Sequence, residues 1–395
     1  MKSYIINILN NSLIYKYIYK LCKIFIPKDQ TNINLNLLNP NQKKILICYI
    51  SLWNKDFKKN FHAQTYHLNQ MIYYFIHKGF CIDICELNDK KAYDRLCHNN
   101  YDIIIGSGDV YKQFCLTRKI PLKINFITEN NPIIVKEKYQ ERIDYFKQRN
   151  PNINPRKSIV RMGYYDISQF KMSDAGILMT SNYNAQTFKP YFNNLNLINC
   201  NAIFNENYIF SDKEIIETID NNRYNFLWFG STGFIHKGLD LLIDTFKELP
   251  NFTLNCYGID HREVPLFNLT KNKNTINHGN INVLSDDFYK QIILKHNFVL
   301  FPSCSEGMST AIATCMAHGL IPIITKECGI ETIPSIIEFQ SIDIKTIKKT
   351  IMQTLEMSKD EILLRRKECY NYARKNYSLK NFDEQFRNIM DSILQ

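Results

Sequence analysis

The chain has 395 residues, enough for two domains that each bury a core of their own. Apolar residues make up 45% and charged residues 22%, which is the balance of a folded protein and excludes intrinsic disorder. The formal net charge of +11 is modest for this length. Because no helix-turn-helix, zinc-finger or RNA-binding signature accompanies the charge, we do not expect nucleic acid among the partners.

The first residues combine apolar and basic side chains. In MKSYIINILNNSLIYKYIYKLCKIFIP, polar residues such as Asn10, Lys16 and Lys20 interrupt the apolar positions, so no stretch is long enough to cross a bilayer. No small-residue cleavage site of the secretory type is present. The pattern favours a basic amphipathic helix on an anionic membrane surface, and a helix packed on the protein is the alternative. We assign residues 1–42 to this extension and an Asn-rich linker, and expect a cytoplasmic protein with peripheral membrane contact.

The cysteines and the other metal-ligating residues show no metal pattern. Twelve cysteines occur, without a C-x-x-C pair, and several lie in strand-like apolar runs. That spacing predicts buried, reduced thiols rather than a disulfide framework or a zinc site. No His, Asp and Glu residues cluster at metal-ligand spacing either, so we expect no metal and no other cofactor.

Strand and helix patterns alternate from about residue 43. The apolar run at 44–50 (KILICYI) is typical of a parallel strand buried on both faces. Residues 64–77 have helical spacing, and Gly79 is suited to cap their C-terminal end. Further strands are predicted at 80–87, 102–105, 123–128 and 175–180. We therefore expect a Rossmann-like domain over residues 43–205.

A second alternating series begins at residue 225. Strands are predicted at 225–230, 253–257, 298–301 and 320–325, and helices at 239–249, 287–295 and 309–318. This alternation requires a parallel sheet with right-handed crossovers. The tail from Lys359 is helical, with a turn signal at 377–378. A second Rossmann-like domain over residues 206–395 would face the first across a cleft, where a ligand is expected.

Residues 228–242 (WFGSTGFIHKGLDLL) combine a strand end, a glycine-containing loop and a helix start. The loop consists of Gly230, Ser231, Thr232 and Gly233. Glycines permit a ligand to approach the backbone closely, and the amides at a helix start favour negative charge. Lys237 opens the helix and adds a mobile point charge suited to a diphosphate, although a surface lysine at this place would be ordinary.

Residues 298–331 (FVLFPSCSEGMSTAIATCMAHGLIPIITKECGIE) have a similar arrangement. Pro302 turns the chain after a buried strand, and Glu306 precedes a helix that Ser309 or Thr310 caps. Amides at the start of that helix point at any group placed before it. A carboxylate among them can orient sugar hydroxyls while the amides hold a phosphate. A solvated loop carboxylate is the alternative for Glu306.

The segments HKGLDLL and PSCSEGMSTAIATCMAHGLIPI resemble the donor-domain signature of the group 1 glycosyltransferases, family 4 in the carbohydrate-enzyme classification. The resemblance is strong over about residues 226–331, extends to the C-terminus, and is weaker across the first domain. It implies the α/β GT-B fold, in which two Rossmann-like domains face each other across a cleft and C-terminal helices cross back to the first domain. It also implies sugar transfer with retention of configuration, without a metal.

The resemblance assigns roles to single residues. Lys237 matches the basic residue that grips the donor diphosphate, and Glu306 matches the first of two glutamates eight positions apart, which contacts the transferred sugar. The amides around the sugar and distal phosphate match Gly307, Met308, Ser309 and Thr310. The second glutamate, which holds the ribose, falls on Thr314, whose hydroxyl lacks the strength of a charge-assisted bond. The basic residue often found after the first strand of this domain is absent, because Ser231 and Thr232 stand there.

The acceptor side carries fewer signals. Residues 51–67 (SLWNKDFKKNFHAQTYH) replace the usual glycine pair and place His62 and His67 near the expected cleft edge. Glu129 and Asn130 follow a strand at its carboxyl end, where ligands bind in such sheets. We take His62, Glu129 and Asn130 as acceptor-side candidates, with a loop-structuring role as the alternative.

The leading hypothesis is hexose transfer from a nucleotide sugar to a glycan or lipid-linked acceptor, as in polysaccharide biosynthesis. Lys237 and the helix amides would stabilise the leaving diphosphate, and Glu306 would position the sugar, with no residue assigned as nucleophile or base. A catalytically silent nucleotide- or glycan-binding module of the same fold is the alternative, motivated by Thr314 and Ser231. A sugar-nucleotide epimerase is less favoured, because its acid and base carboxylates cannot be placed.

Overall fold

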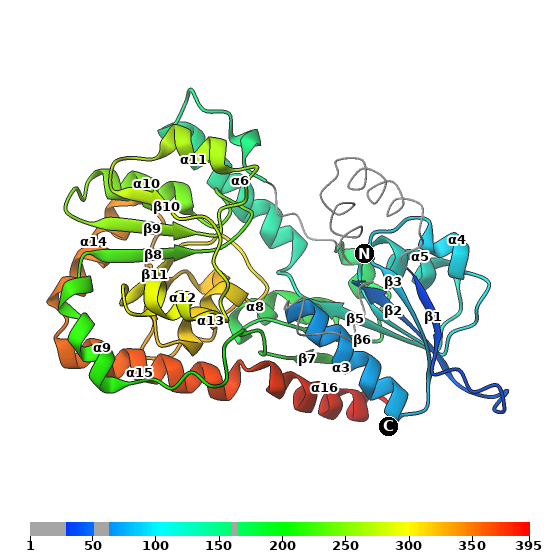
Figure 1. Cartoon of the computed structure of the whole chain (residues 1–395). Coiled ribbons are helices and arrows are strands. Elements are labelled where there is room, and N and C mark those ends of the chain that lie inside the picture. Colours follow the sequence, from blue (N-terminus) through cyan, green and yellow to red (C-terminus); the bar gives the residue numbers. More distant parts are fainter. Residues whose placement is uncertain (1–28, 51–62, 160–164) are drawn as a thin grey trace, which may run out of the picture.

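The chain forms two α/β domains, each built on its own sheet (Figure 1). The computed structural model describes residues 29–50, 63–159 and 165–395. The first sheet has seven strands in the order β1-β3-β2-β4-β5-β6-β7, and the second has six in the order β10-β9-β8-β11-β12-β13. The basic helical extension that we predict near the N-terminus lies outside the described residues. Within them, no helix has both the length and the apolar character needed to cross a membrane.

The first sheet is parallel except for its edge strand β1. Its strands are β1 (Gln30–Ile33), β2 (Lys44–Tyr49), β3 (Cys81–Glu86), β4 (Ile103–Gly106), β5 (Leu122–Ile127), β6 (Ala175–Leu178) and β7 (Leu195–Leu197). Ile47 of β2 lies opposite Ile84 on one side and Ile105 on the other, and all three side chains are fully buried. Burial on both faces explains why these strands read as continuous apolar runs.

Helices cover both faces of this sheet. They are α3 (Ala63–His77), α4 (Ala92–Leu96), α5 (Gly108–Thr117), α6 (Pro132–Arg149), α7 (Ile167–Lys171) and α8 (Asn182–Ala185). Because neighbouring strand residues point to opposite faces, Ile45 and Ile47 pack with α3, while Leu46 and Cys48 pack with α4 and α5. α6 extends away from its own sheet toward the second domain (Figure 1).

The second sheet is parallel throughout. Its strands are β8 (Asn225–Phe229), β9 (Thr253–Tyr257), β10 (Thr275–Asn277), β11 (Phe298–Phe301), β12 (Ile321–Ile324) and β13 (Ile337–Glu338). The chain builds outward from β8 to one side and then from β11 to the other, so the direction of strand order reverses between them. The carboxyl ends of β8 and β11 at such a switch point form a crevice that is suited to a ligand.

The helices of the second domain enclose this sheet and continue into the C-terminal tail. They are α9 (Asp212–Thr218), α10 (Leu239–Lys247), α11 (Val264–Thr270), α12 (Asp286–Phe288), α13 (Thr310–Ala317), α14 (Ile344–Gln353) and α15 (Lys359–Asn376), and α16 (Leu379–Ile393) follows. α15 packs on the second domain against α13, and α16 lies beside α3 of the first domain (Figure 1). Ser378, at the turn predicted between the two helices, is the residue that precedes α16.

Most predicted elements appear within a few residues of their expected bounds, two predictions differ, and several elements, α6 among them, were not predicted. Part of the expected linker is strand β1, which pairs antiparallel with β3. The helix expected at 287–295 is the short α12 followed by a π-helical turn at Tyr289–Ile293. The 18-residue α6 was not predicted, although its buried residues Val135, Tyr139, Arg142 and Phe146 follow helical spacing, one of them being a charged arginine.

Candidate functional site

A cavity of about 760 Å³ lies between the two domains, at the carboxyl ends of strands from both sheets. The first domain contributes residues that end or follow β2, β5 and β6, namely Tyr49, Thr128, Glu129, Asn130 and Met179. The second domain contributes the loops after β8 and β11, which the switch point brings together. Both domains therefore form the walls of one site.

This cavity brings together most of the residues predicted for the site. From the second domain its lining includes Gly230, Ser231, Thr232, Lys237, Glu306, Gly307, Met308, Ser309, Thr310 and Thr314. Gly233 is not among the lining residues, because its amide turns to the buried carboxylate of Glu263 and donates to Oε2 at 2.8 Å. His62 lies outside the described residues.

Glu306 stands in the cavity wall with only 9% of its surface exposed. Its Oε1 accepts a hydrogen bond from Ser303 Oγ at 3.1 Å and lies 3.5 Å from Lys237 Nζ. Its amide donates to the carbonyl of Glu327 at 2.8 Å, which fixes the backbone of the loop. A buried carboxylate with a cationic neighbour differs from the solvated loop carboxylate that was the alternative.

Lys237 is also buried, with 4% of its surface exposed, so its charge is held in place rather than mobile as we predicted. Its Nζ lies 5.2 Å from the centre of the Phe301 ring, at the end of β11. The next residue, Gly238, has a φ of +69°, and a Cβ there would approach the Pro302 carbonyl oxygen to 2.4 Å. Glycine at this position therefore lets the two loops of the second domain approach each other.

Sequence reasoning missed two neighbours of this pair. His236 is 2% exposed, its Nε2 hydrogen-bonds with the carbonyl of Ser305, and the same nitrogen lies 3.9 Å from Glu306 Oε1. Ser305 is buried in the cavity lining, and within the described ranges its hydroxyl has no hydrogen-bond partner. The position of His236 directly before Lys237 was the available signal, whereas Ser305 gave none.

The loop from Glu306 to Thr310 is held by side chains of the first domain. Thr180 Oγ1 donates to the Gly307 carbonyl at 2.7 Å, and Asn184 Nδ2 donates to the Glu306 carbonyl at 3.0 Å. Asn201 Nδ2 donates to the Met308 carbonyl at 3.0 Å and to Thr310 Oγ1 at 2.6 Å. Three of these bonds are accepted by carbonyls of the loop and one by the Thr310 hydroxyl, and together they fix the loop at the contact between the domains.

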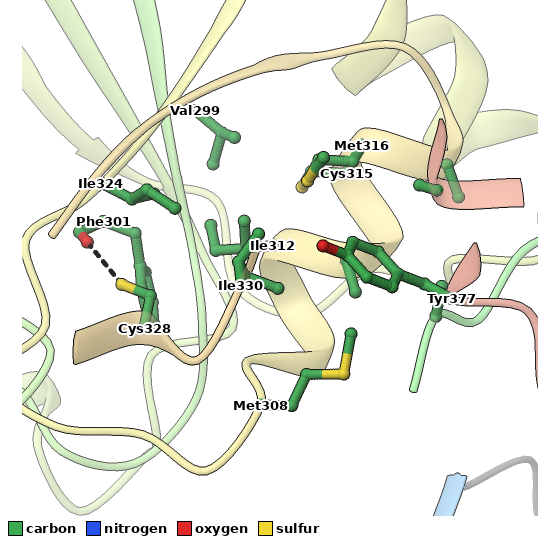
Figure 2. Packing of buried hydrophobic residues seen from close by; sticks show 14 of the residues in the cluster. Val299, Phe301, Met308, Ile312, Cys315, Met316, Ile324, Cys328, Ile330 and Tyr377 are labelled. Atoms are coloured by element: carbon green, nitrogen blue, oxygen red, sulfur yellow. Dashed lines mark hydrogen bonds between the residues drawn. The ribbon is translucent and has the colours of Figure 1, made fainter. Parts of the chain in front are cut away.

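The core behind this loop anchors α13, whose first turn faces the cavity. Ser309 caps the helix by accepting from the Ile312 amide, and its own amide, which we predicted to face the phosphate, instead donates to the Cys328 carbonyl at 3.1 Å. Figure 2 shows Ile312 of α13 beside Ile330, with the ring of Tyr377 directed toward them and Cys328 donating to the carbonyl of Phe301. Thr314 lies one turn further along α13, and its hydroxyl accepts from the Ile203 amide at 3.0 Å. The hydroxyl expected at the ribose is therefore also part of the contact between the domains.

The residues on the acceptor side differ in their burial and in their hydrogen bonds to the surrounding loops. Asn130 is 2% exposed, and its Oδ1 accepts from the amide of Asn131, which in turn caps α6. Glu129 also lines the cavity and is half-buried. His67 is 1% exposed, hydrogen-bonds with the Cys200 carbonyl and stacks on the Phe382 ring. Asn130 thus has a loop-structuring role in addition to its place in the wall.

The burial of the cysteines in the described ranges agrees with the sequence analysis. The cysteines there are free thiols, and most of them are buried. Burial raises the pKa of the Cys304 thiol to about 12, so this neighbour of the site is a protonated thiol at neutral pH. Across residues 29–50, 63–159 and 165–395, no group of three or more His, Cys, Asp or Glu side chains is arranged to hold a metal ion.

Comparison with known families places the second domain. Residues 223–345 match the family described as glycosyl transferases group 1, over a segment that includes both loops carrying Lys237 and Glu306. The second domain is a group 1 glycosyltransferase domain. The predicted family is therefore confirmed for this segment of the second domain.

Solved structures similar to this chain span nearly its whole length. Sucrose-phosphate synthase from Thermosynechococcus elongatus has a TM-score of 0.59 and 13% identity, over 90% of this chain and 99% of that one. WaaG, a glycosyltransferase of lipopolysaccharide biosynthesis, has a TM-score of 0.55 and 13% identity, over 88% and 99%. Anabaena HepE in complex with UDP-glucose has a TM-score of 0.57 and 12% identity, over 88% and 99%. At these identities the likeness shows the fold alone, and it confirms GT-B. A sequence search of curated proteins gave no match.

Proposed function

We propose that this glycosyltransferase moves a hexose from a nucleotide sugar to a glycan or lipid-linked acceptor, with retention of configuration. The observation that carries the proposal is the pair of Glu306 and Lys237, buried 3.5 Å apart in the wall of the cavity between the domains. The structure of HepE with UDP-glucose makes uridine diphosphate sugars the first donors to test.

The chemistry of the pair follows from where charge develops during transfer. Breaking the bond between the sugar and the diphosphate leaves negative charge on the leaving group. Lys237 and the amides at the start of α13 would stabilise that charge, because a preorganised cation and a helix N-terminus both favour an anion. Glu306 would hold the sugar hydroxyls and favour the positive charge that builds on the sugar ring. No side chain is assigned as nucleophile or general base.

The acceptor would enter from the first domain, past Glu129 and Asn130. We place the enzyme in the cytoplasm, with the lysines of residues 1–28 making weak contact with anionic lipid, worth about a kcal/mol each near the surface. The alternative of a catalytically silent binding module keeps two observations in its favour. Ser231 stands where a basic residue is usual, and the Thr314 hydroxyl is engaged by the Ile203 amide.

A donor panel tests the proposal. Nucleotide sugars are incubated with glycan and lipid-linked acceptors, sugar transfer is followed by mass spectrometry, and the anomeric configuration of the product is read by NMR. Transfer with retention supports the proposal. Nucleotide binding without transfer to any acceptor would instead support the silent module.

Lys237→Ala sharpens this test. We expect transfer to fall on the order of a hundredfold, since the variant removes a preorganised charge from the leaving group. Lys349→Ala, an exposed lysine on α14, is the matched control and should keep the parent rate. Near-parent turnover of Lys237→Ala at saturating donor would contradict the phosphate role.

A further inference from the structure

The cavity lining has few positive charges to balance the negative charges of a bound diphosphate. Lys237 is paired with Glu306, and Glu129 adds a second carboxylate to the lining. A nucleoside diphosphate brings several negative charges into this space, and burying them without cationic partners is strongly unfavourable. Among the described residues of the lining, Arg262 is the other side chain with a permanent positive charge.

The loop that carries Arg262 lies directly beside the glycine loop of the site. It follows β9, the neighbour of β8 in the sheet. The Gly230 amide donates to the Tyr257 carbonyl at 3.2 Å. A Cβ on Gly258, whose φ is +83°, would come within 2.2 Å of the Gly230 carbonyl oxygen. The glycine at 258 thus permits the two loops to touch, which brings Arg262 to the edge where Ser231 and Thr232 supply no charge.

The residue after Arg262 fixes this loop in place. Glu263 is fully buried, and its carboxylate accepts from the amides of Gly233 and Phe234 at 2.8 and 2.9 Å. The same carboxylate accepts from the Ile159 amide at 2.7 Å and from Ser158 Oγ at 3.1 Å. Glu263 therefore joins the loop of Arg262 to the glycine loop and to the first domain at once.

The guanidinium itself is oriented but accessible. Nε and Nη2 of Arg262 donate to the two carboxylate oxygens of Asp260, each at 2.8 Å, while 58% of the side chain is exposed. The hydrogen bonds from Arg262 lower the pKa of Asp260 to about 2, so the pair is charged at neutral pH. A guanidinium has five N–H donors, and this pair uses two of them. The remaining donors are suited to phosphate oxygens.

We propose that Arg262 is a second cation for the diphosphate of the donor, and that Asp260 is the positioning residue that directs it. The inference rests on the proposed function, because it places the nucleotide sugar in the cavity described above. It assigns to the loop after β9 the charge that the glycine loop after β8 lacks. A purely structural role, in which Arg262 only holds Asp260 and the loop, is the competing explanation.

Calorimetric titration of the full-length protein separates the two explanations. UDP, ADP, GDP and dTDP are titrated into the parent protein, and each is compared with the corresponding nucleoside monophosphate. The nucleotide whose diphosphate binds most tightly is then used with the variants. Arg262→Ala should weaken the diphosphate roughly tenfold or more, as for a lost charge-assisted bond, and the monophosphate clearly less. Arg262→Lys should retain part of the diphosphate affinity, because lysine keeps the positive charge but not the planar guanidinium that can donate two parallel hydrogen bonds. Asp260→Asn should weaken the diphosphate by less than Arg262→Ala does.

The matched control is Arg387→Ala, which removes an arginine that is paired with Asp383 on α16, outside the cavity lining, and should leave both affinities unchanged. Equal losses for the diphosphate and the monophosphate in Arg262→Ala would show a structural role and overturn the inference, as would parent-like diphosphate binding. A parent protein that binds none of the diphosphates would overturn both proposals. Arg262-dependent diphosphate binding without any sugar transfer would overturn the proposed function alone.

Discussion

Glu306 and Lys237 are two buried charges that lie 3.5 Å apart. Taking either ion out of water is unfavourable by several kcal/mol in a protein interior, and the attraction of a partner and added hydrogen bonds offset that penalty. Here the offset comes from the 3.5 Å approach of Nζ to Oε1 and from the bond donated by Ser303. Truncating either partner also affects the folded state, so a variant of Glu306 that keeps the shape of the side chain complements the Lys237→Ala test.

Glu306→Gln is that variant. Glutamine keeps the size and hydrogen-bonding reach of the side chain but loses the charge that would favour a positively charged transition state. We expect the turnover number to fall by roughly a hundredfold or more, while the affinity for the donor changes little, because only interactions stronger in the transition state accelerate chemistry. The measurement is steady-state kinetics together with calorimetric binding of the nucleotide sugar.

Glu356→Gln removes an exposed carboxylate far from the cavity lining and serves as its control. If Glu306→Gln transfers sugar like the parent protein, then the carboxylate does not act on the sugar. A loss confined to donor affinity would also contradict the assigned role, because it would place Glu306 at the nucleotide.

At the scale of elements, two arginines of α6 connect the first domain to the second. Arg149, at the end of α6, pairs with Asp240 and Asp244 of α10. Arg142 lies two turns earlier on the same face of α6. It is buried and donates to the carbonyl of Pro302, at the turn after β11. α6 therefore docks beside both loops that carry the site, and its position sets how the two domains meet.

Arg149→Met should destabilise the protein in a pH-dependent manner. Burial raises the pKa of Asp240, and the charge of Arg149 opposes that rise, so the pKa should rise further in the variant. A carboxylate whose folded pKa lies above its unfolded pKa is protonated more readily in the folded state, so stability is gained as the pH falls through the folded value. We expect a loss of about 3–5 kcal/mol at neutral pH, which shrinks as the pH is lowered.

Urea unfolding of parent and variant across a pH series measures this difference. Lys147→Met, at an exposed lysine on the same helix, should cause little change at any pH. A deficit of Arg149→Met that stays constant with pH would show that lost packing, not the unpaired Asp240, is responsible.

The same elements show what the sequence could predict and what required the structure. β2 and β11 were predicted because strands buried on both faces are continuous apolar runs. β1 escaped detection because it is a polar edge strand held partly by a bond from the Asn32 amide to Asp83. Lys237 and Glu306 were found because both follow strand ends in recognisable motifs. Arg262 was missed because its nearness to the cavity depends on the pairing of β8 with β9, which no local pattern reveals.

For the whole molecule, the last two helices tie the domains together. α15 is anchored in the second domain by Arg366, which is fully buried and donates to the carbonyls of Gly319 and Ile293 at 2.7 and 2.9 Å. α16 returns to the first domain and packs its apolar face on α3 (Figure 1). There the Phe386 ring meets Tyr74 edge-on at 5.6 Å and lies 6.5 Å from the Phe75 ring. The C-terminal end of the chain thus completes the core of the first domain.

Phe386→Ala tests this dependence. The side chain is fully buried, and replacing such a phenylalanine by alanine typically destabilises by about 3–5 kcal/mol. Because the cavity would open between α16 and α3, the loss should fall on the first domain. We expect limited proteolysis with mass spectrometry to show faster cleavage in residues 63–200, with the second domain cut at the parent rate. Lys380→Ala, an exposed residue on the same helix, is the control. Equal acceleration in both domains would mean that they open as one cooperative unit, and α16 would then stabilise the whole chain rather than the domain it covers.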